Sequence, residues 1–423
     1  MTVSLSAASN CYRSTPLAER STTKPGFASA LAGAIVLAAI LFNFGLCFLS
    51  TRGYAIGAGS VIACEVLILS AALLLGLPEL TVTLLLSGVA VVTWLLILYL
   101  LNPDMEIKIF RDLAIPFGFY ALGKSRGNPA SADRLVYIIV AISLLVGIWE
   151  MIDETGYENF FDIIDYYINK GGASESQAND SGTLLFVSGI RPDEQGRSIL
   201  PILGGHRVSS VMLEPVSAGN LGAIAVLWFI ARGASRSVLS VVACIASAAI
   251  VVVADSRLGL GICAVGLLAY FRPPLRSTIV LIVAPFLVVA FLLALAALAG
   301  DSTIDNGLLG RLLSSGSLML SWGPDQWFGL KPSPAYPWDS GYGYVFSNMG
   351  LLPSAALWGA LICSQSRDGQ TDGFTASLAL YFTLSLAVSG SVFTIKTAAL
   401  LWFLRGALDA RHSAAIPYAT VSA

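Results

Sequence analysis

The sequence predicts an all-α polytopic membrane protein with about twelve transmembrane helices, and three observations support this fold class. Of the 423 residues, 56% are hydrophobic and only 12% are Asp, Glu, Lys or Arg. The mean hydropathy is +0.77. The apolar residues gather in runs of membrane-spanning length, joined mostly by short polar connections. This composition excludes an ordinary water-soluble enzyme, in which about a quarter of the residues are charged.

The predicted spans follow a polar N-terminal tail, residues 1–26. The first apolar run is much longer than the roughly 7 to 15 residues of a signal-peptide core, so we expect a retained helix. The fourth run contains Pro116 and is short for an upright span, which favours a tilted or re-entrant helix. Residues 27–410 form one membrane domain, and residues 411–423 form a C-terminal tail. The predicted spans are residues 27–50, 55–76, 80–101, 113–123, 134–151, 217–231, 238–254, 258–271, 278–299, 343–363, 373–390 and 392–405.

The distribution of Lys and Arg sets the predicted orientation. Basic residues lie in the N-terminal tail, in the short connections that return to the same side, and near the C-terminus. By the positive-inside rule, both termini are expected in the cytoplasm. Two long loops, residues 152–216 and 300–342, then lie on the outer face. Because long loops commonly carry binding and catalytic residues, we expect the functional site there.

Each long loop has a recognisable pattern. In the first, the aromatic and aliphatic stripe of residues 155–168 predicts a helix that lies on the membrane surface. In the second, a short helical pattern over residues 308–313 precedes an aromatic stretch. Three of the eight tryptophans fall between Trp322 and Trp338. Such rings offer faces on which sugars stack, although an interfacial aromatic belt has the same composition.

Cations are few on the predicted outer face. From Thr155 to Pro215, four Lys or Arg residues stand against eight Asp or Glu residues, so the arginines are not part of a generic basic surface. Arg is suited to bidentate capture of phosphate or carboxylate, and salt bridges to neighbouring acids are the alternative interpretation. The outer-face cations are Arg191, Arg197, Arg207, Arg257, Arg311 and Lys331.

The densest group of polar side chains lies between Gly204 and Asn220, at the entry to the predicted sixth span. Arg207, His206 and Glu214 place a cation, an imidazole and a carboxylate together at the membrane surface. Alone, His206 is consistent with a structural histidine, and Glu214 with a charge that favours a helix N-terminus. Together with an arginine they form a candidate site.

Three stretches resemble the membrane-embedded superfamily of O-antigen ligases and Wzy-type polysaccharide polymerases. Two large outer loops on a twelve-span, GT-C-like chain also match that superfamily. Its ligases carry a histidine in the second long loop, and this chain has none there, which favours a polymerase over an O-antigen ligase. The chain is most similar to exopolysaccharide polymerases of the xanthan type. The stretches are Arg207–Pro215 with Gly219–Asn220, Asp255–Gly259, and Asp339–Tyr342 followed by Asn348–Gly350.

The resemblance implies polymerisation of oligosaccharide repeat units linked to undecaprenyl pyrophosphate, at the periplasmic face of the bacterial inner membrane. Arg207, Arg257 and Arg311 would hold the pyrophosphate leaving group, whose negative charge grows in the transition state. Glu214 is the first choice for the base that accepts the proton of the acceptor hydroxyl, with His206 and Asp339 as alternatives. The residues expected to bind substrate are Arg191, His206, Asn220, Lys331, Trp338, Asp339 and Tyr342.

The sequence gives no sign of a metal or cofactor. It has no Asp-x-Asp motif, and its two histidines, His206 and His412, are predicted to lie on opposite membrane faces. Expected partners are lipid-linked glycans and the bilayer, with a chain-length regulator and export machinery as candidates. A net charge of -2 without a basic tail argues against nucleic acid. The alternative function is a transporter or lipid-linked sugar flippase, indicated by Glu65 and Lys396 inside predicted spans.

Overall fold

The computed structural model confirms an all-helical chain with membrane-spanning helices. It describes residues 26–79, 81–172, 185, 197–203, 205–233, 237–300, 307–335, 340–363 and 369–413, and no strand occurs within these ranges. Six of the described helices are long and apolar enough to cross a membrane. The number is seven if α15 (Gly341–Met349) and α16 (Leu351–Cys363), which meet at a bend of 111°, count as one span.

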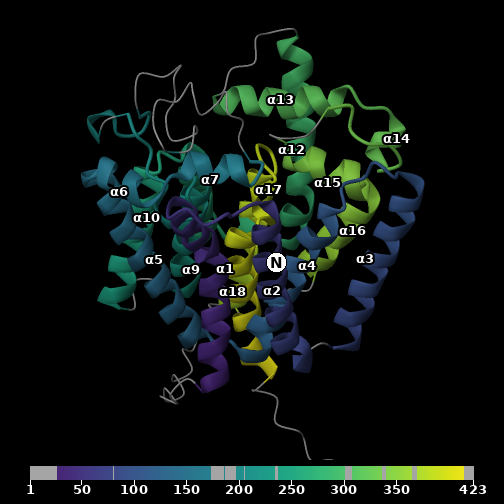
Figure 1. Cartoon of the computed structure of the whole chain (residues 1–423). Coiled ribbons are helices and arrows are strands. Elements are labelled where there is room, and N and C mark those ends of the chain that lie inside the picture. Colours follow the sequence, from purple (N-terminus) through teal and green to yellow (C-terminus); the bar gives the residue numbers. More distant parts are fainter. Residues whose placement is uncertain are drawn as a thin grey trace, which may run out of the picture.

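The long helices run side by side in one bundle (Figure 1). Each of the twelve predicted apolar runs coincides with one helix or with the bent pair, whereas twelve membrane crossings stay a prediction. Shorter helices α6 (Glu154–Phe160), α7 (Ile163–Asn169), α13 (Leu308–Leu320) and α14 (Pro324–Trp327) lie at the upper end in Figure 1. The remaining helices are α1 (Phe27–Thr51), α2 (Ala58–Gly76), α3 (Val82–Leu101), α4 (Lys108–Arg126), α5 (Pro129–Ile152), α9 (Pro215–Arg232), α10 (Val238–Val253), α11 (Arg257–Phe271), α12 (Thr278–Ala299), α17 (Gly369–Ser385) and α18 (Ile395–Ser413).

The segment around Pro116 forms one continuous helix, and whether it is tilted or re-entrant in the membrane stays a prediction. Helix α4 has 19 residues, which at about 1.5 Å per residue reaches about 28 Å. It packs closely on α18, because a Cβ at Gly123 would overlap the carbonyl oxygen of Phe403 and a Cβ at Gly406 would overlap that of Tyr120. Small residues allow such close backbone approach in membrane helices, so this interface compensates for the low hydropathy of α4.

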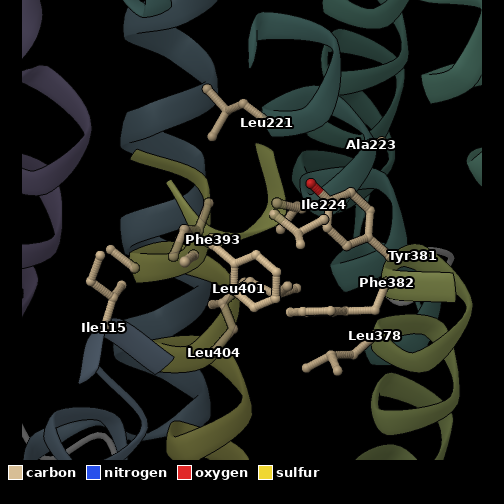
Figure 2. Packing of buried hydrophobic residues seen from close by; sticks show 14 of the residues in the cluster. Ile115, Leu221, Ala223, Ile224, Leu378, Tyr381, Phe382, Phe393, Leu401 and Leu404 are labelled. Carbon is tan, nitrogen blue, oxygen red and sulfur yellow. The ribbon is translucent and has the colours of Figure 1, made fainter. Parts of the chain in front are cut away.

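The core lies where α4, α9, α17 and α18 meet. Figure 2 shows Ile115, Leu221, Phe382 and Leu401, one from each of these helices, pointing into this interior. Of the six candidate spans, α9 is the most deeply buried. Its first turn therefore occupies a fixed position at the end of the bundle that also bears α7 and α13.

The segment predicted to lie on the membrane surface instead packs into the protein. It divides into α6 and α7, and all its aromatic side chains except that of Phe160 are buried. The Tyr157 hydroxyl donates to the Ser210 carbonyl oxygen at 2.9 Å, and the Tyr166 hydroxyl donates to Oδ1 of Asn43 at 2.6 Å. The apolar stripe packs against α1 and the loop before α9, so the prediction of a membrane-surface helix was wrong. The periodicity of a sequence shows which face of a helix is apolar, but not whether protein or lipid covers that face.

Candidate functional site

The turn between α10 and α11 is held in a strained conformation. Asp255 has a φ of +49°, and the other described non-glycine residues with positive φ, Ser210 and Leu213, flank the entry to α9. Such conformations need support from their surroundings and often occur at functional sites. The fully buried Asp255 carboxylate accepts hydrogen bonds from the Ile199 N–H at 2.8 Å and from the Ser198 hydroxyl at 3.0 Å. These contacts tie the end of the first long loop to this turn.

Arg207, in the loop before α9, contacts the same turn. Its side chain is buried, and its Nε donates to the Ala254 carbonyl oxygen at 3.3 Å. Arg257 is the first residue of α11, whose N-cap residue, Ser256, accepts a hydrogen bond from the Gly259 N–H at 3.1 Å. Arg207 therefore contacts the turn that is followed directly by Arg257.

The entry to α9 connects this turn to the third motif stretch. Gly219 lies so close to Ser256 that a Cβ there would overlap the serine side chain. The Asn220 amide donates to the Ser391 hydroxyl at 3.1 Å. Gly341, at the start of α15, in turn approaches the carbonyl oxygen of Ser389. The structure thus brings the three stretches together at one end of the bundle.

Arg311 lies on α13, the helix that runs across this end in Figure 1. Ser315, one turn later, donates from its hydroxyl to the Ala387 carbonyl oxygen at 2.8 Å. Because residues four apart share a helix face, Arg311 lies on the side of α13 that meets the end of α17. We name Arg207, Arg257 and Arg311 the arginine rim.

Glu150 organises the loop that carries His206. It is fully buried in the last turn of α5, and its carboxylate accepts hydrogen bonds from the Ser209 N–H and hydroxyl, each at 2.9 Å. It also lies 2.8 Å from Nε2 of His206, and Glu154 lies 3.7 Å from Nδ1 of that ring. Each ring nitrogen of His206 therefore faces a carboxylate, Nε2 at hydrogen-bond distance and Nδ1 farther away. Sequence reasoning missed Glu150 because it lies inside an apolar run.

Glu214, the base preferred from the sequence, sits in an ion pair. Its carboxylate lies 2.8 Å from Nζ of Lys396 and accepts hydrogen bonds from the hydroxyls of Ser217, at 2.7 Å, and Tyr167. Burial raises the pKa of Glu214, but the charges of Lys396 and Lys170 and the hydrogen bonds from Lys396 and Tyr167 outweigh it and lower the pKa to about 2. A carboxylate that holds its negative charge this firmly suits anchoring Lys396 better than accepting a proton from a hydroxyl.

Acidification should remove this contribution to stability. The Glu214 pKa lies at about 2 in the folded protein against an ordinary value of 4.5, so between these values the folded state binds fewer protons than the unfolded state. The stabilisation is complete above the ordinary value and is lost as the pH falls towards the folded one. Between about pH 6 and about pH 3, the Tm of the wild type should fall more steeply than that of Glu214→Gln. Parallel profiles would contradict this assignment.

Other residues predicted to bind substrate lie in different settings. Lys331 is exposed and pairs with Asp325 at 2.6 Å. Tyr342 is buried, and its hydroxyl donates to the Thr383 carbonyl oxygen at 2.9 Å, so its ring is not available for stacking on a sugar in the outer loop. Arg197, which belongs to no motif, is buried and donates to the Val252 carbonyl oxygen at 3.3 Å. Arg191, Trp338 and Asp339 lie outside the described residues.

Glu65, the main sequence pointer to a transporter, has a charged partner. Its carboxylate lies 2.5 Å from Nη1 of Arg111, and Arg111 also lies 2.7 Å from Asp112. The Tyr344 hydroxyl donates to Asp112 at 2.9 Å. This network joins α2, α4 and α15, and a structural role is sufficient to account for Glu65.

Among the described residues, no group of three or more His, Cys, Asp and Glu side chains is arranged to hold a metal ion. Comparison with family models, curated proteins and solved structures finds no match to this chain. The observations that bear on function are therefore the positions of the three arginines along the chain and the contacts that join the motif stretches.

Proposed function

We propose that this protein polymerises oligosaccharide repeat units linked to undecaprenyl pyrophosphate into exopolysaccharide or O-antigen chains. The reaction takes place at the periplasmic face of the bacterial inner membrane. The observation that carries the proposal is the position of the three motif stretches at one end of the bundle. Arg207 contacts Ala254 and Gly219 contacts Ser256, while Asn220 and Gly341 both contact the segment from Ser389 to Ser391.

The arginine rim supplies what a pyrophosphate leaving group requires. As the acceptor hydroxyl oxygen attacks the anomeric carbon, the bond from that carbon to the pyrophosphate oxygen breaks, and negative charge accumulates on the pyrophosphate. Guanidinium groups held in place beforehand stabilise this charge. Helices α9, α11 and α15 also begin at this end, and their N-termini carry partial positive charge. Leaving-group stabilisation is therefore the main catalytic contribution in this proposal.

His206 is the base that the described contacts favour. Glu150 holds Nε2, and Nδ1 is buried with no hydrogen-bond partner among the described residues. In the proposal, Nδ1 takes the proton that the acceptor hydroxyl loses. Glu214 has a different role in the proposal. Its ion pair with Lys396 joins the start of α9 to α18.

The proposal requires twelve spans, cytoplasmic termini and two periplasmic loops, residues 152–216 and 300–342. Alkaline phosphatase is active only outside the cytoplasm. Fusions after Ser188 and after Ser333 should therefore be active, and a fusion after Arg236 should be inactive. The reverse pattern would place the arginine rim on the wrong side of the membrane.

Purified protein should extend lipid-linked repeat units in the presence of excess EDTA. The driving force comes from the activated donor, and the described site offers no acidic or histidine cluster for a metal. Gel separation of the lipid-linked products would reveal chains of increasing length. Loss of activity in EDTA that magnesium or manganese restores would contradict a mechanism based on arginines alone.

A carrier or lipid-linked sugar flippase is the second candidate, favoured by the charged network of Glu65, Arg111 and Asp112 in the helical layer. A carrier would move repeat units across vesicle membranes and form no glycosidic bond. The same preparation therefore distinguishes the two functions. A chain-length regulator and export machinery are the partners that we propose for a polymerase.

A further inference from the structure

An apolar groove with a volume of about 960 Å³ runs along α3, which stands at the edge of the bundle (Figure 1). Its other walls come from α2, α4, α12, α15, α16, α17 and α18. Tyr342 and Met349 line one end, and Thr81 and Lys124 line the other. Near the first end, the Trp94 indole donates to the Met349 carbonyl oxygen at 2.9 Å, which joins α3 to α15. The groove thus extends along most of the length of α3.

Several polar groups interrupt the apolar wall. Nε of Arg405, the indole N–H of Trp402 and the hydroxyl of Thr383 are buried and have no hydrogen-bond partner among the described residues. Arg405 is only 2% exposed. Buried donors without partners are rare in folded proteins, and of these residues Arg405 is the one beside which an anionic headgroup is placed.

The Lys124 end of the groove carries net positive charge. Arg405 forms an ion pair with Asp409, whose carboxylate also accepts a hydrogen bond from the Tyr120 hydroxyl at 2.7 Å. Lys124 lines the same end. This end of the apolar groove therefore has two cations, Lys124 and Arg405, and one carboxylate, that of Asp409. This combination is complementary to a molecule with an anionic head and long apolar chains.

We propose that the groove binds a phospholipid with an anionic headgroup, its phosphate at Lys124 and Arg405 and its acyl chains along α3. Basic pockets between transmembrane helices commonly hold such headgroups on the cytoplasmic side. In the predicted topology, this end of the groove faces the cytoplasmic leaflet. The inference concerns the end of the bundle away from the arginine rim, and it does not depend on the polymerase function.

Fluorescence quenching tests the proposal on the full-length protein. Bromine on an acyl chain quenches tryptophan on contact, and Trp402 lines the groove. The protein is reconstituted in vesicles of phosphatidylcholine that contain brominated phosphatidylglycerol or, for comparison, brominated phosphatidylcholine. Brominated phosphatidylglycerol should quench the tryptophan fluorescence more strongly than brominated phosphatidylcholine does. This extra quenching should be missing in Trp402→Phe. Equal quenching by the two lipids would overturn the proposal.

Charge variants make the test specific. Lys124→Ala and Arg405→Gln should each reduce the preference for phosphatidylglycerol about fivefold, the factor expected for one basic residue beside an anionic lipid. Arg134→Ala is the matched control, because Arg134 is exposed near the start of α5 and does not line the groove. An unchanged preference in Lys124→Ala, which is partly exposed and has little risk of misfolding, would overturn the proposal. So would displacement of phosphatidylglycerol by an equimolar amount of undecaprenyl phosphate, since the groove would then belong to the carrier lipid.

Discussion

Replacing Arg311 by alanine is expected to leave lipid-linked repeat units unpolymerised while the protein inserts at a normal level. The same result is expected for Arg207→Ala and Arg257→Ala. By analogy with the loss of one donor from an oxyanion hole, each contact made mainly in the transition state contributes about 3 kcal/mol, or roughly a hundred- to a thousandfold in rate. The measurement is the rate of repeat-unit extension by purified variants, compared at matched protein concentration.

The contacts of each arginine determine the controls. Arg197 belongs to no motif, but it is not a neutral control. Its side chain is buried against a carbonyl group at the end of α10, so Arg197→Ala is expected to destabilise the fold. Arg52 is a better control, because it is exposed after α1 and contacts the rings of Phe48 and Phe160. Lysine in place of Arg311 should restore activity only in part, since a point charge lacks the bidentate fork. Normal polymer from well-expressed Arg311→Ala and Arg207→Ala would refute the site.

Lys396→Met is expected to destabilise the protein by about 3 kcal/mol, the lower end of the range for breaking a buried ion pair. The Lys396 side chain is 7% exposed, and its loss leaves the Glu214 carboxylate without its closest cation. Adding Glu214→Gln should recover most of the loss, because the uncompensated charge is then removed. Denaturant unfolding of the purified variants measures both effects.

Lys331→Met is the matched control, because Lys331 pairs with Asp325 on an exposed surface. Such a pair contributes only about 0 to 1 kcal/mol. If Lys396→Met lowered the free energy of unfolding no more than this control does, the ion pair between Lys396 and Glu214 would not stabilise the fold. The double variant also tests the two interpretations of Glu214. Restored stability with normal polymer identifies an anchor, and restored stability without polymer identifies the base predicted from the sequence.

The fold class could be predicted from the sequence because hydropathy is a local property. Each predicted apolar run coincides with helical segments, and the three stretches from Arg207, Asp255 and Asp339 could be selected before any contact was known. The sequence misleads where an apolar stripe of a helix could face either lipid or another helix of the protein. The stripe over residues 155–168 was interpreted as facing lipid, because the sequence does not reveal that α1 covers it.

The composition of the sequence by itself determined that this protein is helical and built for a membrane, because the transfer of apolar segments out of water depends on each segment separately. Only the tertiary structure determined which acidic and basic side chains contact one another. Lys396 and Glu214 are 182 positions apart, and His206 and Glu150 are 56 positions apart. Such pairings depend on how the helices pack rather than on any local pattern. For that reason the sequence could nominate Glu214 as a base, while its role beside Lys396 became visible only in the folded chain.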